Sequence, residues 1–195
     1  MGQLAGALGV APGTATTMVK TLAESGLVEY EPYTGVALTD AGRKLAGTVV
    51  RRHRVIELFL VQVIGYSWDE VHDEAEQLEH AISDEVLDRL DALLGHPEAD
   101  PHGDPIPNRQ GKISSQVYPT LATCVTDRLL RIVRVTEQSE EFLRFAEQNG
   151  LQPGTGIRVV ERNLTAGLVT LRKTSGRAVA LSLPAAGKIL VEPER

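Results

Sequence analysis

The spacing of apolar residues changes once along this chain of 195 residues, and that change constrains the fold more than any other feature. Up to about Leu94 the apolar residues recur three or four positions apart, as they do on one face of a helix. Beyond a stretch rich in proline and glycine they alternate with polar residues, which is typical of short strands. A helical first part and a strand-rich second part predict an α+β protein with more than one domain.

Residues 1–46 are expected to form a winged helix-turn-helix domain. Two helices, at residues 4–8 and about 15–24, are separated by a turn in which Thr14 is a candidate N-cap. A hairpin of residues 27–31 and 36–39, turning at residues 32–35, would form the wing. The second helix of such a fold can enter the major groove of DNA. A packed helix pair without DNA contacts is the structural alternative.

Residues 47–96 are expected to form a second, all-helical domain. Helical periodicity covers residues 41–64, 69–81 and 83–94, with Ser67 or Asp69 as candidate cap of the second helix and Ser83 as cap of the third. The end of the first helix is apolar on nearly all sides. A helix of that kind must be buried on several sides, which in a small domain indicates a subunit interface and therefore a homodimer.

Histidine and glutamate gather on one face of the second of these helices. Positions i, i+4, i+7 and i+8 carry His72, Glu76, Glu79 and His80, and the preceding helix repeats the i, i+4 spacing with His53 and Glu57. Two antiparallel helices could therefore close a site for a divalent cation. Spacing alone leaves a second possibility open, a solvated helix face with i, i+4 contacts.

Residues 97–123 read as a linker, because they are rich in proline and glycine and show no periodicity. His96 and His102 lie in these loops and are expected to be turn residues. Residues 124–195 are expected to form a small SH3-like β-barrel. Five short strands and one helix are predicted there, at residues 130–135, 140–148, 157–160, 168–171, 179–183 and 189–191, with turns that include Ser175-Gly176.

The charge is unevenly distributed. The net charge of −6 conceals a value of −11 for residues 55–112, which hold three basic and fourteen acidic residues. Residues 1–54 carry +2, so the first domain remains compatible with phosphate contacts while the acidic segment suits a cation. One cysteine, Cys124, excludes an internal disulfide and is expected to be a small buried residue, as Trp68 is expected to anchor the core.

No apolar run approaches the roughly 20 residues that span a bilayer. The N-terminal residues also lack the basic segment and apolar core of an export signal. A cytoplasmic location without membrane association is therefore expected.

Three features together resemble the diphtheria-toxin-repressor family of metal-dependent transcriptional regulators. These are the winged helix-turn-helix, the E-x-x-E-H motif that ends in Glu79-His80 with Arg52-His53-Arg54 upstream, and the segment Asp100-Pro101-His102-Gly103-Asp104-Pro105-Ile106-Pro107. The resemblance covers nearly the whole chain and is strongest to the manganese-responsive actinobacterial branch. It implies a C-terminal domain similar to that of ferrous-transport protein A. It also implies a further N-terminal helix, before the position of Met1, that adds a ligand to the primary metal site.

The resemblance assigns roles to individual residues. Glu76, Glu79 and His80 match ligands of the primary metal site, whereas His53, Glu57 and His72 match the ancillary site, with His53 able to serve either. Gln138 and Glu141 lie near the position from which the C-terminal domain of some relatives adds ancillary ligands. The iron-responsive branch has a cysteine in place of Glu76, and a carboxylate is a harder ligand that suits Mn(II), so Mn(II) is expected ahead of Fe(II).

The function implied is a metal-dependent repressor of metal-uptake genes, which as a homodimer reads a palindromic operator. In that reading Thr14, Thr16 and Thr17 face bases, and Lys20 and Arg43 contact phosphates. Two alternatives remain. A dimeric metal-binding module without DNA-binding activity would share the helical domain, and a metallohydrolase would share the His and Glu residues. The motif H-E-x-x-H and a nucleophile-base pair are missing, so no enzyme is expected.

Overall fold

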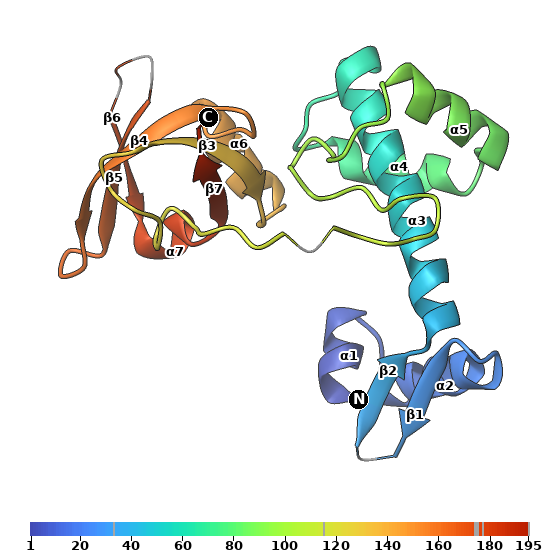
Figure 1. The fold of residues 1–195 in the computed structure, drawn as a ribbon. Helices are drawn as coiled ribbons and strands as arrows, with labels where there is room; N and C mark the ends of the chain where they lie inside the picture. Colours follow the sequence, from blue (N-terminus) through green and yellow to red (C-terminus); the bar gives the residue numbers. More distant parts are fainter. Residues whose placement is uncertain (33, 115, 174–175, 177, 195) are drawn as a thin grey trace. The chain divides into compact units, whose positions relative to one another are not determined.

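The computed structural model describes residues 1–32, 34–114, 116–173, 176 and 178–194 (Figure 1). The chain divides into two compact units. The first comprises Met1–Arg51 with Pro107–Ile113, and the second comprises Arg52–Ile106 with Ser114–Arg195.

The first unit contains the predicted helix pair and hairpin. Its elements are α1 (Gly2–Ala7), α2 (Pro12–Glu24), β1 (Val28–Glu31) and β2 (Gly35–Leu38). β1 and β2 pair antiparallel, which confirms the wing, although Tyr33 in its turn lies outside the described residues. The assignment of Thr14 as N-cap is wrong, because α2 begins at Pro12 with Ala11 as its N-cap. Proline favours the first helical position, where its missing N–H is not needed.

The helical part of the second unit is formed around one long helix. Its elements are α3 (Asp40–Phe59, which begins in the first unit), one π-helical turn η1 (Leu60–Ile64), α4 (Val71–Glu79) and α5 (Asp84–Leu93). Ser83 caps α5 as predicted, since its Oγ accepts the Val86 N–H at 3.3 Å. The N-cap of α4 is Glu70, so neither Ser67 nor Asp69 fills that role. The core includes Val55, Ile56, Leu58, Leu60, Val71, Ala75 and Leu87.

The remaining part of the second unit is a five-stranded antiparallel sheet with two short helices. Its elements are β3 (Leu129–Val135), α6 (Glu140–Gln148), β4 (Gly156–Asn163), β5 (Leu168–Lys173), β6 (Ala178–Ser182), α7 (Leu183–Ala186) and β7 (Ile189–Pro193). The strand order is β6-β5-β4-β3-β7. All five predicted strands are present, while α7 was not predicted. Gly176 is described but Ser175, the other half of a predicted turn, is not.

The segment expected to be a linker is partly packed. It contains no helix or extended strand up to residue 114, yet Asp100, His102, Asp104 and Ile106 are buried. The His102 ring stacks on Trp68 with centroids 5.6 Å apart, and its Nε2 lies 2.7 Å from the Trp68 carbonyl oxygen. Trp68 and Cys124 are both buried, as expected from the sequence. In the part of the chain described, no helix combines the length and apolarity needed to cross a membrane.

Candidate functional site

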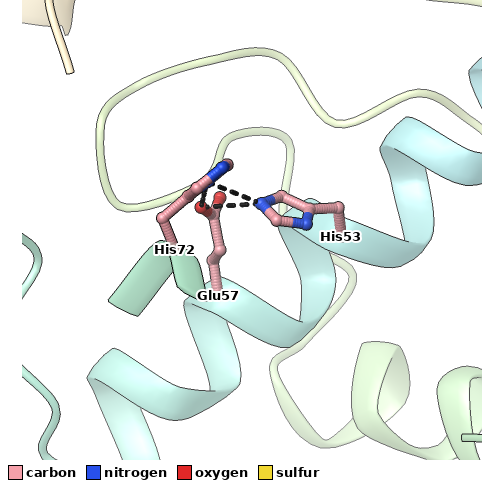
Figure 2. A group of neighbouring side chains, drawn as sticks. All are labelled: His53, Glu57 and His72. Carbon is pink, nitrogen blue, oxygen red and sulfur yellow. Dashed lines mark hydrogen bonds and ion pairs between the residues drawn. The ribbon is translucent and has the colours of Figure 1, made fainter. Parts of the chain in front are cut away.

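Four of the six predicted metal ligands meet between α3 and α4. Figure 2 shows His53 and Glu57, one turn apart on α3, facing His72 from the start of α4. The Nε2 atom of His53 lies 3.0 Å from Glu57 Oε1 and 3.0 Å from His72 Nδ1. The other ring nitrogen, Nδ1, lies 2.8 Å from Oε2 of Glu79. His53 therefore contacts Glu57 and His72 on one side and Glu79 on the other.

The other two predicted ligands lie outside this group. His80 is exposed at the C-cap of α4 and only its Nε2 approaches the group, 3.6 Å from Oε1 of Glu79. Glu76 is exposed on α4. Of the three residues matched to the primary site, only Glu79 contacts His53.

Burial and charge set the protonation of the group. The Glu57 side chain is 3% exposed and that of His53 is 18% exposed. Burial lowers the pKa of His53, but hydrogen bonds and charges from Glu57 and Glu79 raise it more, so this pKa lies above 6.5. Burial raises the pKa of Glu57, but the hydrogen bond and charge of His53, together with His102 and His72, outweigh burial, so the pKa of Glu57 lies below 4.5. His53 therefore holds a proton more tightly than a free imidazole does, whereas Glu57 ionises more readily, and a divalent cation would meet the same donors.

The donor set fits a divalent transition-metal ion. One ligand atom each from His53, Glu57 and His72 lies within 4.8 Å of the others, so one cation could contact all three. Imidazole nitrogen and carboxylate oxygen are ligands used by Mn(II) and Fe(II). Histidine ligands commonly use their second nitrogen for a carboxylate, and His53 does so with Glu79.

A second buried group shares Glu57 and was missed by the sequence analysis. Ligand atoms of Glu57, Asp100 and His102 lie within 4.8 Å of one another, and all three residues are buried. In the described structure, His102 Nδ1 is buried without a hydrogen-bond partner. Burial and the neighbouring Asp104 carboxylate raise the pKa of Asp100 to about 6. The available signal was two aspartates and a histidine within five residues of an otherwise aperiodic stretch.

The two residues expected near the ancillary site from the C-terminal part behave differently. Gln138 donates from Nε2 to Asp104 Oδ2 at 2.6 Å. Glu141 is exposed in the first turn of α6. Gln138 therefore contacts Asp104 and is not a member of the buried group of Glu57, Asp100 and His102.

The predicted DNA-reading residues lie on and after α2 in the first unit. Thr14, Thr17 and Lys20 are exposed on α2, whereas Thr16 is half-buried. The hydroxyls of Thr16 and Thr17 donate to backbone carbonyls one turn earlier, at 2.8 and 3.1 Å. Their oxygens can still accept a hydrogen bond. Arg43 is held beside the wing, where Nη1 donates to the Leu38 carbonyl at 2.6 Å.

A helix-turn-helix with a wing, together with a His and Glu group on two helices, defines a metal-responsive DNA-binding regulator. Comparison with known families agrees. The description "Iron dependent repressor, N-terminal DNA binding domain" matches residues 1–36, "Iron dependent repressor, metal binding and dimerisation domain" matches residues 39–108, and "FeoA domain" matches residues 120–193.

Individual relatives match along most of their length. The iron-dependent repressor IdeR of Mycobacterium bovis is 32% identical over 191 residues, which is 92% of this chain and 74% of IdeR. The diphtheria toxin repressor of Corynebacterium diphtheriae is 31% identical over 190 residues, or 92% of this chain and 82% of that protein. A solved manganese-dependent transcriptional repressor in complex with manganese has a TM-score of 0.87 and 41% identity, covering 98% of this chain and 89% of that chain.

The chain belongs to the iron-dependent repressor family, the diphtheria-toxin-repressor family of metal-dependent transcriptional repressors. Its fold follows the family, with an N-terminal DNA-binding domain, a helical metal-binding and dimerisation domain, and a C-terminal FeoA domain of SH3-like type. Members of this family are repressors and not enzymes, so the metallohydrolase alternative is set aside.

Proposed function

We propose that this chain is a manganese-responsive repressor of metal-uptake genes that acts in the cytoplasm, with Fe(II) as the second choice of metal. The observation that carries the proposal is the contact of His53 with Glu57, His72 and Glu79 across α3 and α4. Glu76, where iron-responsive relatives carry a cysteine, supplies a hard oxygen donor that suits Mn(II). A solved relative of 41% identity is titled a manganese-dependent repressor in complex with manganese.

The six residues proposed to hold metal are His53, Glu57, His72, Glu76, Glu79 and His80. A divalent cation bound there supplies positive charge that balances the carboxylates of the two helices. His53 and Glu57 on α3 are then held against the donors of α4, which restricts the movement of α3. Metal that binds one arrangement of α3 better shifts the population toward it, and a few kcal/mol of differential affinity is enough to change DNA occupancy.

The DNA-binding surface is proposed to comprise Thr14, Thr16 and Thr17 toward bases and Lys20 and Arg43 toward phosphates. Two copies of the chain would place two wings on a palindromic operator, with half-sites about one helical turn apart. Val63, Ile64 and Leu93 are exposed apolar side chains of the helical domain, in line with burial against a second copy. We also propose domain limits of 1–46, 47–96 and 124–195, with residues 97–123 as the connecting segment.

The experiment measures binding of the chain to the promoter of a metal-transporter gene by fluorescence anisotropy, with and without Mn(II) at physiological salt. We expect Mn(II) to increase the affinity at least tenfold and the variant with both Glu76 and Glu79 changed to glutamine to lose this response. Asp73→Asn, an exposed change on the same helix, is the matched control. Mn(II) binding in calorimetry without DNA binding would favour the dimeric metal-binding module instead.

A further inference from the structure

Asp104 is a buried carboxylate that receives donors from three separate segments of the second unit. Its Oδ2 accepts a hydrogen bond from Gln138, just before α6, at 2.6 Å. Its Oδ1 forms an ion pair with Arg134 of β3 and lies 3.6 Å from Nη2 of Arg54 on α3. The side chain is only 5% exposed. A buried carboxylate costs much free energy unless it is paired, and each of these three contacts brings a donor or a positive charge to Asp104.

The loop that carries Asp104 is hydrogen-bonded to α3 on one side and to β3 on the other. Asp100 Oδ1 accepts the N–H groups of His102 and Asp104 at 2.8 and 2.9 Å, which closes the loop on itself. Arg54 donates to the Pro105 carbonyl at 2.6 Å and so ties the loop to α3. On the other side, the Val135 N–H of β3 donates to the His102 carbonyl at 2.8 Å. The FeoA domain is thus attached to α3 through this loop.

The attachment point lies beside the proposed metal site. Arg54 precedes Glu57 by three residues, so both lie on neighbouring positions of one face of α3. Asp100 and His102 of the same loop approach Glu57 directly. Any displacement of this face of α3 must therefore move the loop that holds the FeoA domain.

We propose that Asp104 is a positioning residue that fixes the FeoA domain to α3, so that docking of this domain and metal binding at His53, Glu57 and His72 strengthen each other. The docking role stands on the contacts of Asp104 and its loop, whereas the coupling rests on the proposed function. Coupling of this kind is reciprocal, so loss of docking must weaken metal binding by the factor by which metal strengthens docking.

The test is hydrogen exchange by NMR on the whole chain and on Asp104→Asn, which keeps the size of the side chain and removes its charge. The backbone amides of Val135 and Thr136 distinguish loss of docking from a general loosening of the FeoA domain. The Val135 N–H bonds to the loop, whereas the Thr136 N–H bonds to the Lys188 carbonyl within the FeoA domain at 2.8 Å. Without metal we expect Asp104→Asn to raise exchange at Val135 about tenfold and to leave Thr136 unchanged. Glu192→Gln, which breaks the Arg131–Glu192 pair of the same sheet, is the control and should alter neither.

Mn(II) titration calorimetry provides the second measurement. We expect Asp104→Asn to bind Mn(II) at least about fivefold more weakly than the unaltered chain does, because fivefold is the lower end of usual coupling factors. Unchanged exchange at Val135, or an equal rise at Val135 and Thr136, would overturn the docking role. Equal Mn(II) affinity in both chains would overturn the coupling. If the unaltered chain binds no Mn(II), the proposed function fails, while the Val135 result still decides the docking role.

Discussion

Replacement of Gly103 by alanine should destabilise the second unit far more than the same change at another glycine of similar conformation. Gly103 adopts φ +87°, and a Cβ added to it would overlap the Val133 carbonyl oxygen and lie 2.7 Å from the Cα of Arg134. Real Cβ atoms essentially never approach other atoms within 3.0 Å. All of these neighbours are backbone atoms of β3, so the loop and the strand must separate.

The matched control is Gly154→Ala. Gly154 has φ +90°, but a Cβ there would meet no atom within 4 Å. Both changes therefore carry the left-handed penalty of about 1–2 kcal/mol. Only Gly103→Ala also loses the His102–Val135 hydrogen bond, about 1 kcal/mol, and leaves buried Asp104 short of donors, about 1–2 kcal/mol more. The expected difference is about 2–3 kcal/mol, or roughly 4–12 °C in Tm for a chain of this size.

The assay is urea unfolding followed by the fluorescence of Trp68, the single tryptophan of the chain. Its ring is buried and stacks on His102, one residue before the substituted glycine, so the signal reports on the loop itself. Equal losses of unfolding free energy in Gly103→Ala and Gly154→Ala would show that the close approach to β3 contributes nothing, and the reasoning would be wrong.

Three further predictions concern metal and DNA. Glu79→Gln should weaken Mn(II) binding more than tenfold in calorimetry because it removes a carboxylate that contacts His53. The exposed control Asp73→Asn should leave Mn(II) binding unchanged, and equal Mn(II) affinities of the two variants would contradict the proposed site. The pKa of His53 is raised and its nitrogens bind metal only when unprotonated, so Mn(II) affinity should fall as the pH is lowered through that pKa. The protons released on binding should make the calorimetric heat depend on the ionisation enthalpy of the buffer. Heats that are the same in every buffer would refute this prediction. Lys20→Gln should weaken operator binding and reduce the slope of log affinity against log salt concentration by about 1. Lys188→Gln is the control and should leave this slope unchanged. An unchanged slope in Lys20→Gln would exclude a phosphate contact by Lys20.

The elements that the sequence predicted well are those determined by local pattern. Helix α6 has the predicted limits because an amphipathic run follows Ser139 at its N-cap. The strand β3 alternates between buried and exposed side chains over most of its length, as the apolar spacing required. The start of α2 was misplaced because a Pro-Gly pair was read as part of a turn, although proline is also favoured at the first position of a helix.

The candidate site was predictable only in part, because its residues meet through contacts distant in sequence. The i, i+4 spacing placed Glu57 one turn from His53, and their contact is local. That His53 also meets Glu79, 26 residues further on, depends on how α3 and α4 pack. The loop around Asp104 was read as a linker for the same reason, since the partners that bury His102 and Asp104 lie 34 residues away on either side.

Several of these long-range contacts involve α3, which therefore connects the proposed metal site to the loop that holds the FeoA domain. Glu57 belongs both to the group with His53 and His72 and to the buried group with Asp100 and His102. A carboxylate that is almost fully buried cannot turn toward one group without altering its distance to the other. We therefore expect a cation bound at either group to shift the loop at Asp100, and with it the contacts that the same loop makes to β3. The helix that carries the proposed metal ligands His53 and Glu57 is thus also the helix to which the FeoA domain is attached.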